Sequence, residues 1–439
     1  MLKCAFYERE ITPPLGCNLP GYGSLRQGSD VKDRLMAKAC VISDGNETVA
    51  LIALDSLRIV YEVREEIAKR VNKFTGIPEE NVLVAAIHTH TGIPEKYYKA
   101  HKDAVESQAH YFDIFPKIIA DCAILAYKRL ADSEMSFGIG NVDGISFCRD
   151  YNMKNSTPRT NPGRLNPDII GPASKTDNEL PVLFVKDANG KPKGAILCFA
   201  CHLDCVDGTE FTGDFASELS AQMKKLYGED FVTVFFMGTA GDINHFNVKT
   251  AFDAPDHYRK MGRKIAGEAL RVISFAEPVI GDNVKCKFEI IKIDRNHISE
   301  ERIAAAKHTV ATVKEIPGIK IAADGTSKEQ YDLMMAKKLL TFVDVDPEQF
   351  DVPLHFIQIG DVKFYGFPSE IFCFFGLSLK EKCQYPKRIV ASYCNGAYGY
   401  VPTKEMFHDT VYESLPGSNR LEKNAGYIMV DKLIEMGNM

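Results

Sequence analysis

The apolar run Val82–Ile87, which leads directly into His88-Thr89-His90, is the feature that most constrains the fold of this chain. Six successive apolar residues predict a strand that is buried on both faces. Residues i and i+2 of an extended strand point to the same side, so His88 and His90 should converge where the strand emerges. Open α/β sheets bind ligands at the carboxyl ends of their strands, so these imidazoles indicate a metal or acid/base site. The alternative is a pair of hydrogen-bonded core histidines.

Strand and helix patterns alternate around this motif. Val49–Leu54 predicts a strand, and apolar residues every four positions predict a helix from about Val60 to Phe74. Together with the motif strand they form a β-α-β unit, whose crossover should be right-handed. A helical pattern over 296–341 predicts a hairpin inserted between strands of the core. We therefore expect an α/β fold, with a mixed β-sheet core, flanking helices and this helical insert, in a single catalytic domain spanning 1–439.

Three further apolar runs also lead into side chains that can bind a metal. His202 follows the run at 197–201, Glu370 comes shortly after the run at 362–367, and Tyr400 comes after the run at 388–393. A catalytic zinc site needs three or four N, O or S ligands and one open position. Strand ends from distant parts of the chain can supply two histidines and a carboxylate. Each residue has a structural alternative: a core histidine, a carboxylate in a first helical turn, and a packing tyrosine.

An ordered series of short motifs resembles the neutral/alkaline ceramidases and their shorter bacterial relatives. The resemblance runs through most of the chain, and its order matches the family. The motifs are Ile11-Thr12-Pro13-Pro14, Gly21-Tyr22, Asp55, His88-Thr89-His90-Thr91-Gly92, Phe199-Ala200-Cys201-His202, Gly213-Asp214, Gly241-Asp242-Ile243-Asn244, Pro368-Ser369-Glu370 and Tyr400-Val401-Pro402-Thr403. This family is a zinc amidohydrolase that cleaves the N-acyl bond of ceramide.

The resemblance implies a role for individual residues of this chain. His90 would be the acid/base or water-orienting group. The family places a substrate-side arginine in the irregular segment 143–174, and Arg149 is the nearest match. An arginine there could clamp a carboxylate or polarise an acyl oxygen, and the alternative is an exposed loop arginine. The implied Zn²⁺ ligands are His88, His202, Glu370 and Tyr400.

Two departures from the family bear on the substrate. Asn244 stands where ceramidases carry a serine. An amide cannot replace a nucleophilic hydroxyl, but it can hold an oxyanion or a substrate hydroxyl. The chain also stops at Met439, shortly after the tyrosine motif, where ceramidases continue into a β-sandwich. The resemblance therefore implies the fold and the metal chemistry more strongly than it implies ceramide.

Composition narrows the choice of partners and compartment. A net charge of −6 gives no electrostatic reason to expect nucleic acid or an anionic membrane as a partner. The sequence contains no stretch of about 20 apolar residues, so we expect no integral membrane contact. The amino terminus lacks the apolar core of a signal peptide. Several of the 12 cysteines lie inside apolar runs, which is typical of free thiols in a reducing cytoplasm.

The residues are best interpreted as a zinc-dependent hydrolase of an N-acyl (amide) bond, acting through a metal-activated water on a small, soluble acylated molecule. His90 would transfer the proton, and Asn244 or Arg149 would stabilise the oxyanion. The alternatives are an esterase or deacetylase with the same site, a genuine ceramidase, a non-catalytic metal- or ligand-binding relative, and an amidohydrolase-type TIM barrel, whose eight regular βα units are not visible. The oligomeric state and a second metal at Asp55 or Asp242 stay open.

Overall fold

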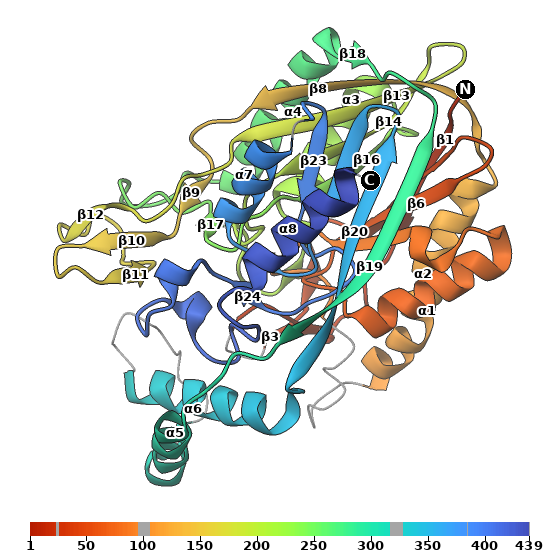
Figure 1. Cartoon of the computed structure of the whole chain (residues 1–439). Coiled ribbons are helices and arrows are strands. Elements are labelled where there is room, and N and C mark those ends of the chain that lie inside the picture. Colours follow the sequence, from red (N-terminus) through yellow and green to blue (C-terminus); the bar gives the residue numbers. More distant parts are fainter. Residues whose placement is uncertain (23–25, 95–105, 317–327, 384, 439) are drawn as a thin grey trace.

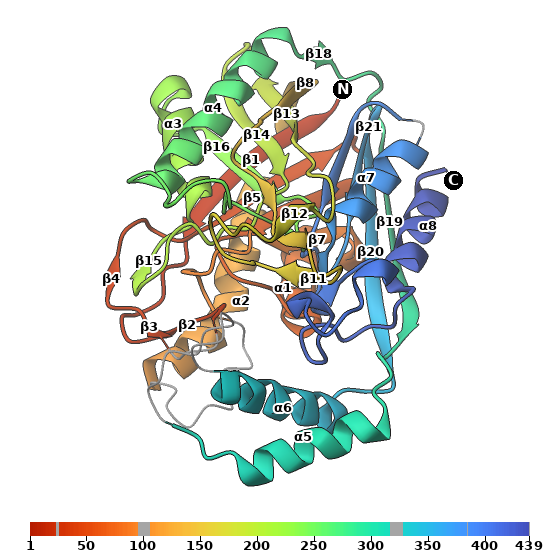
Figure 2. The same ribbon diagram turned by 90° about the vertical axis from the view of Figure 1, so that its left-hand side faces the viewer.

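Two β-sheets pack face to face between two layers of helices in the computed structural model (Figure 1). Figure 2 shows this order from one side of the molecule to the other: helices, larger sheet, smaller sheet, helices. The structure describes residues 1–22, 26–94, 106–316, 328–383 and 385–438.

The larger sheet is mixed. Most of its neighbouring strands are antiparallel, but β6 pairs with β7, and β14 with β16, in parallel. In spatial order it consists of β16 (Val232–Met237), β14 (Pro192–Phe199), β13 (Glu179–Asp187), β8 (Ala131–Asn141), β1 (Lys3–Glu10), β5 (Met36–Ser43), β6 (Thr48–Leu54) and β7 (Val82–Ala86), and β18 (Glu277–Pro278) pairs with β8.

The smaller sheet is formed by the carboxy-terminal part of the chain. Its strands are β19 (Val284–Asp294), β20 (Gln349–Ile359), β21 (Val362–Gly366) and β23 (Arg388–Ala391), in this spatial order. The last two strands are parallel, and the other pairs are antiparallel. The α/β class and the mixed sheet are therefore confirmed, but the core contains two sheets rather than one.

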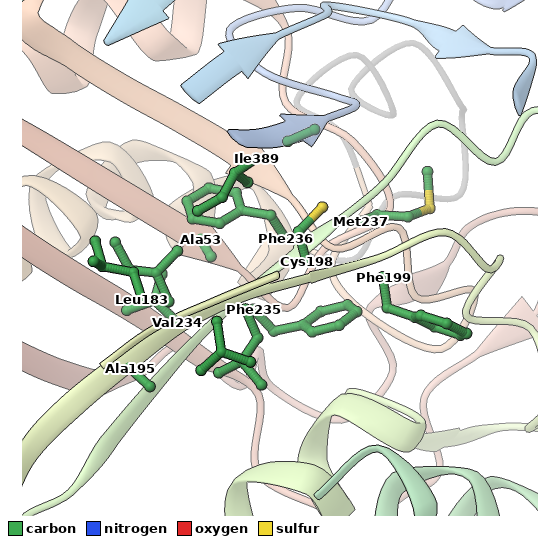
Figure 3. Packing of buried hydrophobic residues seen from close by; sticks show 14 of the residues in the cluster. Ala53, Leu183, Ala195, Cys198, Phe199, Val234, Phe235, Phe236, Met237 and Ile389 are labelled. Carbon is green, nitrogen blue, oxygen red and sulfur yellow. The ribbon is translucent and has the colours of Figure 1, made fainter. Parts of the chain in front are cut away.

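Side-chain alternation along β16 decides what lies on each face of the larger sheet. The ring of Phe236 lies 5.0 Å, between centroids, from Phe364 of the smaller sheet. The ring of Phe235 lies 5.8 Å from Phe215, on a helix on the opposite side. Figure 3 shows Phe236 beside Ile389 of β23, with Phe235 and Phe199 on the other side of the strands. The inner face thus packs sheet on sheet, and the outer face packs against helices.

The helices form the two outer layers. In the first of them, Val63, Ile67 and Val71 are buried against the larger sheet, and the helix that carries them ends at Gly76, whose φ is 77°. The larger sheet is covered by α1 (Tyr61–Thr75), α2 (Glu106–Tyr127), α3 (Phe215–Tyr227) and α4 (His257–Phe275), and the smaller sheet by α7 (Cys373–Lys382) and α8 (Ala425–Asn438). The predicted β-α-β unit is therefore present as β6-α1-β7, with its strands parallel.

The predicted helical insert is confirmed. It consists of α5 (Glu300–Thr312) and α6 (Lys328–Val345), which lie between β19 and β20 in the chain and project from one end of the molecule (Figure 2). The connection at 317–327 lies outside the described residues. Among the helices that the structure describes, none is long and apolar enough to cross a lipid bilayer.

Short strands and 3₁₀ turns complete the fold. The segment 143–174, predicted to be irregular, contains the short strands β9 to β12. The short strands are β2 (Asn18–Leu19), β3 (Arg26–Gln27), β4 (Asp30–Val31), β9 (Phe147–Cys148), β10 (Asp150–Met153), β11 (Pro158–Thr160), β12 (Ile169–Pro172), β15 (Glu210–Phe211), β17 (Ile243–Asn244), β22 (Glu370–Ile371) and β24 (Tyr400–Val401), and the 3₁₀ turns are Glu79–Asn81, Lys404–Met406 and Tyr412–Ser414.

Candidate metal and catalytic centre

The residues proposed from strand ends lie together in the folded chain. One ring nitrogen from each of His88, His90 and His202 lies within 4.8 Å of the other two. These histidines follow β7 and β14. Glu370 opens β22, which pairs in parallel with β24, so that Glu370 stands opposite Tyr400. All five side chains are buried.

The two histidines of the motif converge for a different reason from the one the sequence predicted. Regular strand geometry ends at Ala86, and His88 adopts a left-handed backbone conformation with a φ of 70°. Its backbone N–H donates to the carbonyl of Ser56 at 3.0 Å. The rings of His88 and His90 then meet edge to face, with 5.0 Å between centroids. Non-glycine residues held in this conformation are strained, and such strain concentrates at functional sites.

Backbone carbonyls fix the orientation of two of the imidazoles. The Nδ1 of His88 donates to the carbonyl of Leu57 at 2.8 Å. The Nδ1 of His202 lies 2.7 Å from the carbonyl of Ala240 and 2.9 Å from that of Ile243. A carbonyl only accepts, so Nδ1 carries the proton in both rings, and in the neutral form of each ring Nε2 presents a lone pair. This is the arrangement in which proteins hold histidines that bind metals.

The two Nε2 atoms face the same carboxylate oxygen. Oε2 of Glu370 lies 3.4 Å from Nε2 of His88 and 3.2 Å from Nε2 of His202. Burial lowers the pKa of His88, which favours the neutral ring. Neutral imidazole lone pairs facing a carboxylate repel one another unless a cation lies between them, so these donors fit a metal ion such as Zn²⁺.

His90 differs from the other two histidines. Neither of its ring nitrogens has a hydrogen-bond partner among the described residues, although the ring is buried. The ring of Tyr22 packs against it, with 5.0 Å between centroids. Burial, and then the neighbouring His88, hold the pKa of His90 well below its usual range. A neutral imidazole with both nitrogens unpaired can accept a proton or bind a metal.

The space for the His90 ring depends on Gly21, which allows a test. A Cβ at Gly21 would lie 2.5 Å from Nδ1 of His90. Gly21→Ala should therefore displace the His90 ring. If this ring takes part in the reaction catalysed at the site, kcat should fall about tenfold or more, because catalysis is sensitive to small misplacements of a reacting group. Steady-state kinetics measures the effect. The control is Gly45→Ala, which has a similar φ of 95° but nothing within 4 Å of the added Cβ. Equal turnover in the two variants would contradict this account.

Arg149 lies at the site and is not an exposed loop arginine. Its side chain is buried, and Nη1 lies 3.5 Å from Nε2 of His202. Nη2 forms an ion pair with Oε1 of Glu413 at 2.5 Å. The guanidinium also stands over the ring of Tyr400, 5.1 Å from its centroid. Burial raises the pKa of the Tyr400 hydroxyl well above its usual range, although Arg149 opposes this, so the tyrosine is neutral in the absence of a metal.

Asn244 directly follows Ile243, whose carbonyl contacts His202, but its own amide is hydrogen-bonded to other residues. Its Nδ2 donates to Oδ1 of Asn161 at 3.3 Å, and its Oδ1 accepts the backbone N–H of Phe246 at 3.0 Å. No hydrogen bond joins its amide to the three histidines or to Glu370 in the part of the chain that the structure describes. The structure therefore brings Arg149, but not the Asn244 amide, into contact with the imidazoles.

Asp242 supports the site through the backbone. Its Oδ1 accepts the N–H of Cys373 at 2.7 Å, and its Oδ2 accepts the hydroxyl of Ser174. Its own carbonyl accepts the N–H of Arg149 at 2.8 Å. The aspartate thus fixes the start of α7 and the backbone of Arg149.

Asp55 is buried at the end of β6. Its Oδ2 accepts the N–H of Met36 at 2.9 Å, and its carbonyl accepts the N–H of Ile93 in the loop that follows the histidine motif. Burial raises the pKa of Asp55 to about 6, although the charge of Lys38 opposes this. The folded protein therefore disfavours the ionised carboxylate.

This raised pKa predicts a pH effect on stability. The pKa of Asp55 is higher in the folded chain than its ordinary value of 3.8. Stability from this group is therefore greatest below about pH 4 and is lost as the pH rises through about 6. Asn cannot ionise, so Asp55→Asn should lose about 1 kcal/mol less unfolding free energy than the wild type between about pH 5 and pH 7.5. Urea unfolding at both pH values measures this, and an identical pH dependence would contradict it.

Three functional candidates escaped the sequence analysis. Tyr393 stacks on the ring of His88, with 4.5 Å between centroids. Glu413 pairs with Arg149. Oδ1 of Asp204 lies 3.5 Å from Nε2 of His245. Burial opposes its ionisation, but the basic side chains around it, with His245 first among them, lower its pKa to about 2. The position of Asp204, two residues after His202, and that of Tyr393, at the end of an apolar run, were the available signals. Glu413 had none.

Comparisons with known proteins find relatives of this chain by sequence and by fold. Residues 8–252 match the family model described as neutral/alkaline non-lysosomal ceramidase, N-terminal. The chain is 26% identical to neutral ceramidase B of Dictyostelium discoideum over 244 residues, which cover 52% of this chain and 33% of that protein. It is 22% identical to the neutral ceramidase of Pseudomonas aeruginosa over 457 aligned positions, which cover 90% of this chain and 65% of that protein. The chain thus spans less than two thirds of either curated relative.

A solved structure shares the fold. The crystal structure of the neutral ceramidase from Pseudomonas aeruginosa superimposes with a TM-score of 0.74, over 99% of this chain and 74% of that chain, at 20% sequence identity.

Proposed function

The chain belongs to the neutral/alkaline non-lysosomal ceramidase family, and from this premise we propose that it is a zinc-dependent hydrolase of an N-acyl (amide) bond. The observation that carries the proposal is the meeting of two Nε2 lone pairs, on His88 and His202, with one carboxylate oxygen of Glu370. Carbonyls hold one proton of each ring on Nδ1, an arrangement that would leave the three donors free to bind a single cation.

The ligands of the zinc ion would be His88, His202 and Glu370, with Tyr400 as the fourth. Tyr400 stands opposite Glu370 in the β22–β24 pair, and its ring lies parallel to that of His202 at 6.4 Å. A bound Zn²⁺ supplies a Lewis acid and lowers the pKa of a water molecule to about 7.

The surrounding side chains would move the proton and bind the developing charge. His90 is neutral and has two unpaired ring nitrogens, so one of them can take a proton from the attacking water and return it to the leaving amine. Arg149 places a buried positive charge beside His202, where it can stabilise an oxyanion. Asn244 would contribute only after its bond to Asn161 is exchanged for one to substrate.

The narrower proposal concerns the substrate. The buried ion pair of Arg149 and Glu413 lies beside His202. Charged groups at this position would favour a small polar acyl compound, which can form hydrogen bonds with them. Both relatives are neutral ceramidases, which favours ceramide, an acylated lipid, as the alternative. Both substrates contain the amide bond that the site would cleave.

A substrate panel separates these alternatives. N-acyl amino acids with short chains, N-acetyl sugars and ceramide in detergent would be assayed side by side. We expect the soluble amides to turn over at least about tenfold faster than ceramide, since a buried polar contact left unmade costs about 1–3 kcal/mol, and about 1.4 kcal/mol corresponds to tenfold in rate. Turnover of ceramide alone would contradict the substrate proposal and keep the amide hydrolase, and failure of every amide would contradict both.

A further inference from the structure

A second group of metal-binding side chains lies outside the centre described above. Cys205 belongs to the loop after β14, His245 follows β17, and His257 is the first residue of α4. One ligand-type atom from each of the three lies within 4.8 Å of the other two. We propose that these residues bind a second Zn²⁺ ion through a cysteine thiolate and two imidazoles.

Unpaired ring nitrogens point to a ligand. Nδ1 of His245 and Nε2 of His257 are shielded from solvent, and among the described residues neither has a hydrogen-bond partner. Leaving a buried polar atom unpaired costs about 1–3 kcal/mol. A metal ion would satisfy both nitrogens at once.

An oxygen atom lies near enough to support each ring from its other nitrogen. Nε2 of His245 lies 3.5 Å from Oδ1 of Asp204. The ring of His257 is hydrogen-bonded to the backbone of His245. A carboxylate or backbone oxygen on one ring nitrogen is the usual support for a histidine that binds metal through the other. The two rings are therefore oriented as ligands, with 5.2 Å between their centroids.

The donor set selects the metal class. One sulfur and two imidazole nitrogens suit zinc, and tetrahedral zinc ligands lie roughly 3.5 Å apart for bonds of about 2.0–2.3 Å. The three donors therefore need to approach by about an ångström on binding. Oδ2 of Asp253 lies 3.8 Å from Nδ1 of His245 and can become the fourth ligand. Arg164 holds this carboxylate at 2.5 Å.

The position of the cluster indicates its role. A metal there would tie together the loop after β14, the loop after β17 and the beginning of α4. The first of these loops carries His202 of the first centre and Asp204, whose Oδ1 lies 3.5 Å from Nε2 of His245. Cys205 is half-buried, which leaves a path for the ion.

Cobalt substitution tests the proposal with a signal that the first centre cannot produce. Co²⁺ bound to a thiolate gives an intense near-ultraviolet charge-transfer band, and the first centre offers nitrogen and oxygen donors only. We expect the full-length wild type, titrated with Co²⁺, to show this band, and Cys205→Ser and His257→Ala to lose it. Zinc content should fall from about two ions per chain to about one in both variants.

Two controls separate this site from other effects. Cys286→Ser removes a half-buried thiol that contacts His355 at 3.1 Å, outside the cluster, and should keep the band. His88→Ala alters the first centre and should also keep it, so failure of the amide hydrolase proposal leaves this one testable. A folded wild type with no thiolate band at saturating Co²⁺, or a band that persists in Cys205→Ser, would overturn the proposal.

Discussion

Replacing Glu370 by glutamine should lower both zinc retention and amide turnover, the latter by at least about a thousandfold. The variant keeps the size of the side chain but removes the charge that faces Nε2 of His88 and Nε2 of His202. Loss of a charged ligand from a buried site weakens the stabilisation of charge in the transition state by several kcal/mol, and about 4 kcal/mol corresponds to a thousandfold in rate. Elemental analysis measures the zinc, and kcat/KM measures the second effect.

Glu218→Gln is the matched control for this variant. Glu218, on α3, is also a buried carboxylate, and it accepts a hydrogen bond from Arg263 of α4 at 2.8 Å. Its amide variant should keep both zinc and turnover. Full zinc content and normal turnover in Glu370→Gln would show that the carboxylate is not a ligand.

His90→Ala should retain zinc and lose turnover by about 10²–10⁴-fold, the range expected for removal of a general acid/base. His88 and His202 have Nδ1 on a backbone carbonyl and Nε2 on Glu370, whereas His90 has neither contact. We therefore expect His88→Ala and His202→Ala to lose the metal, in contrast to His90→Ala.

Zinc content and kcat of the three alanine variants should be measured on the same preparations. A ring nitrogen of His90 does lie within 4.8 Å of those of the other two histidines, so the competing outcome is specific. Equal loss of zinc in all three variants would make His90 a third imidazole ligand and would remove it from proton transfer.

The elements that support the centre could be predicted because their signals are local. A continuous apolar run predicts a buried strand wherever it lies in the chain. The strands that precede His88 and His202 are both formed by such runs. The helix between β6 and β7 shows its apolar face every four residues and ends at a glycine. The strand–helix–strand order then favours two parallel strands that lie next to each other in one sheet, as β6 and β7 do.

The remaining features depend on contacts between distant residues. Nothing in the run at 362–367 says that β21 belongs to a second sheet, because side-chain alternation does not identify the partner strand. The left-handed conformation of His88 arises where its backbone bonds to Ser56, and no local signal marks it. Glu413 reaches Arg149 from 264 positions further along the chain, and its surrounding sequence resembles no site motif.

Removal and return of metal test the central proposal most directly. The wild type would be dialysed against a chelator, assayed for amide hydrolysis, and titrated with Zn²⁺ while zinc content and activity are followed together. The three donors at His88, His202 and Glu370 predict that the metal-free protein loses its activity and that Zn²⁺ restores it as the first centre fills. Full activity in protein shown to contain no metal would contradict the proposal.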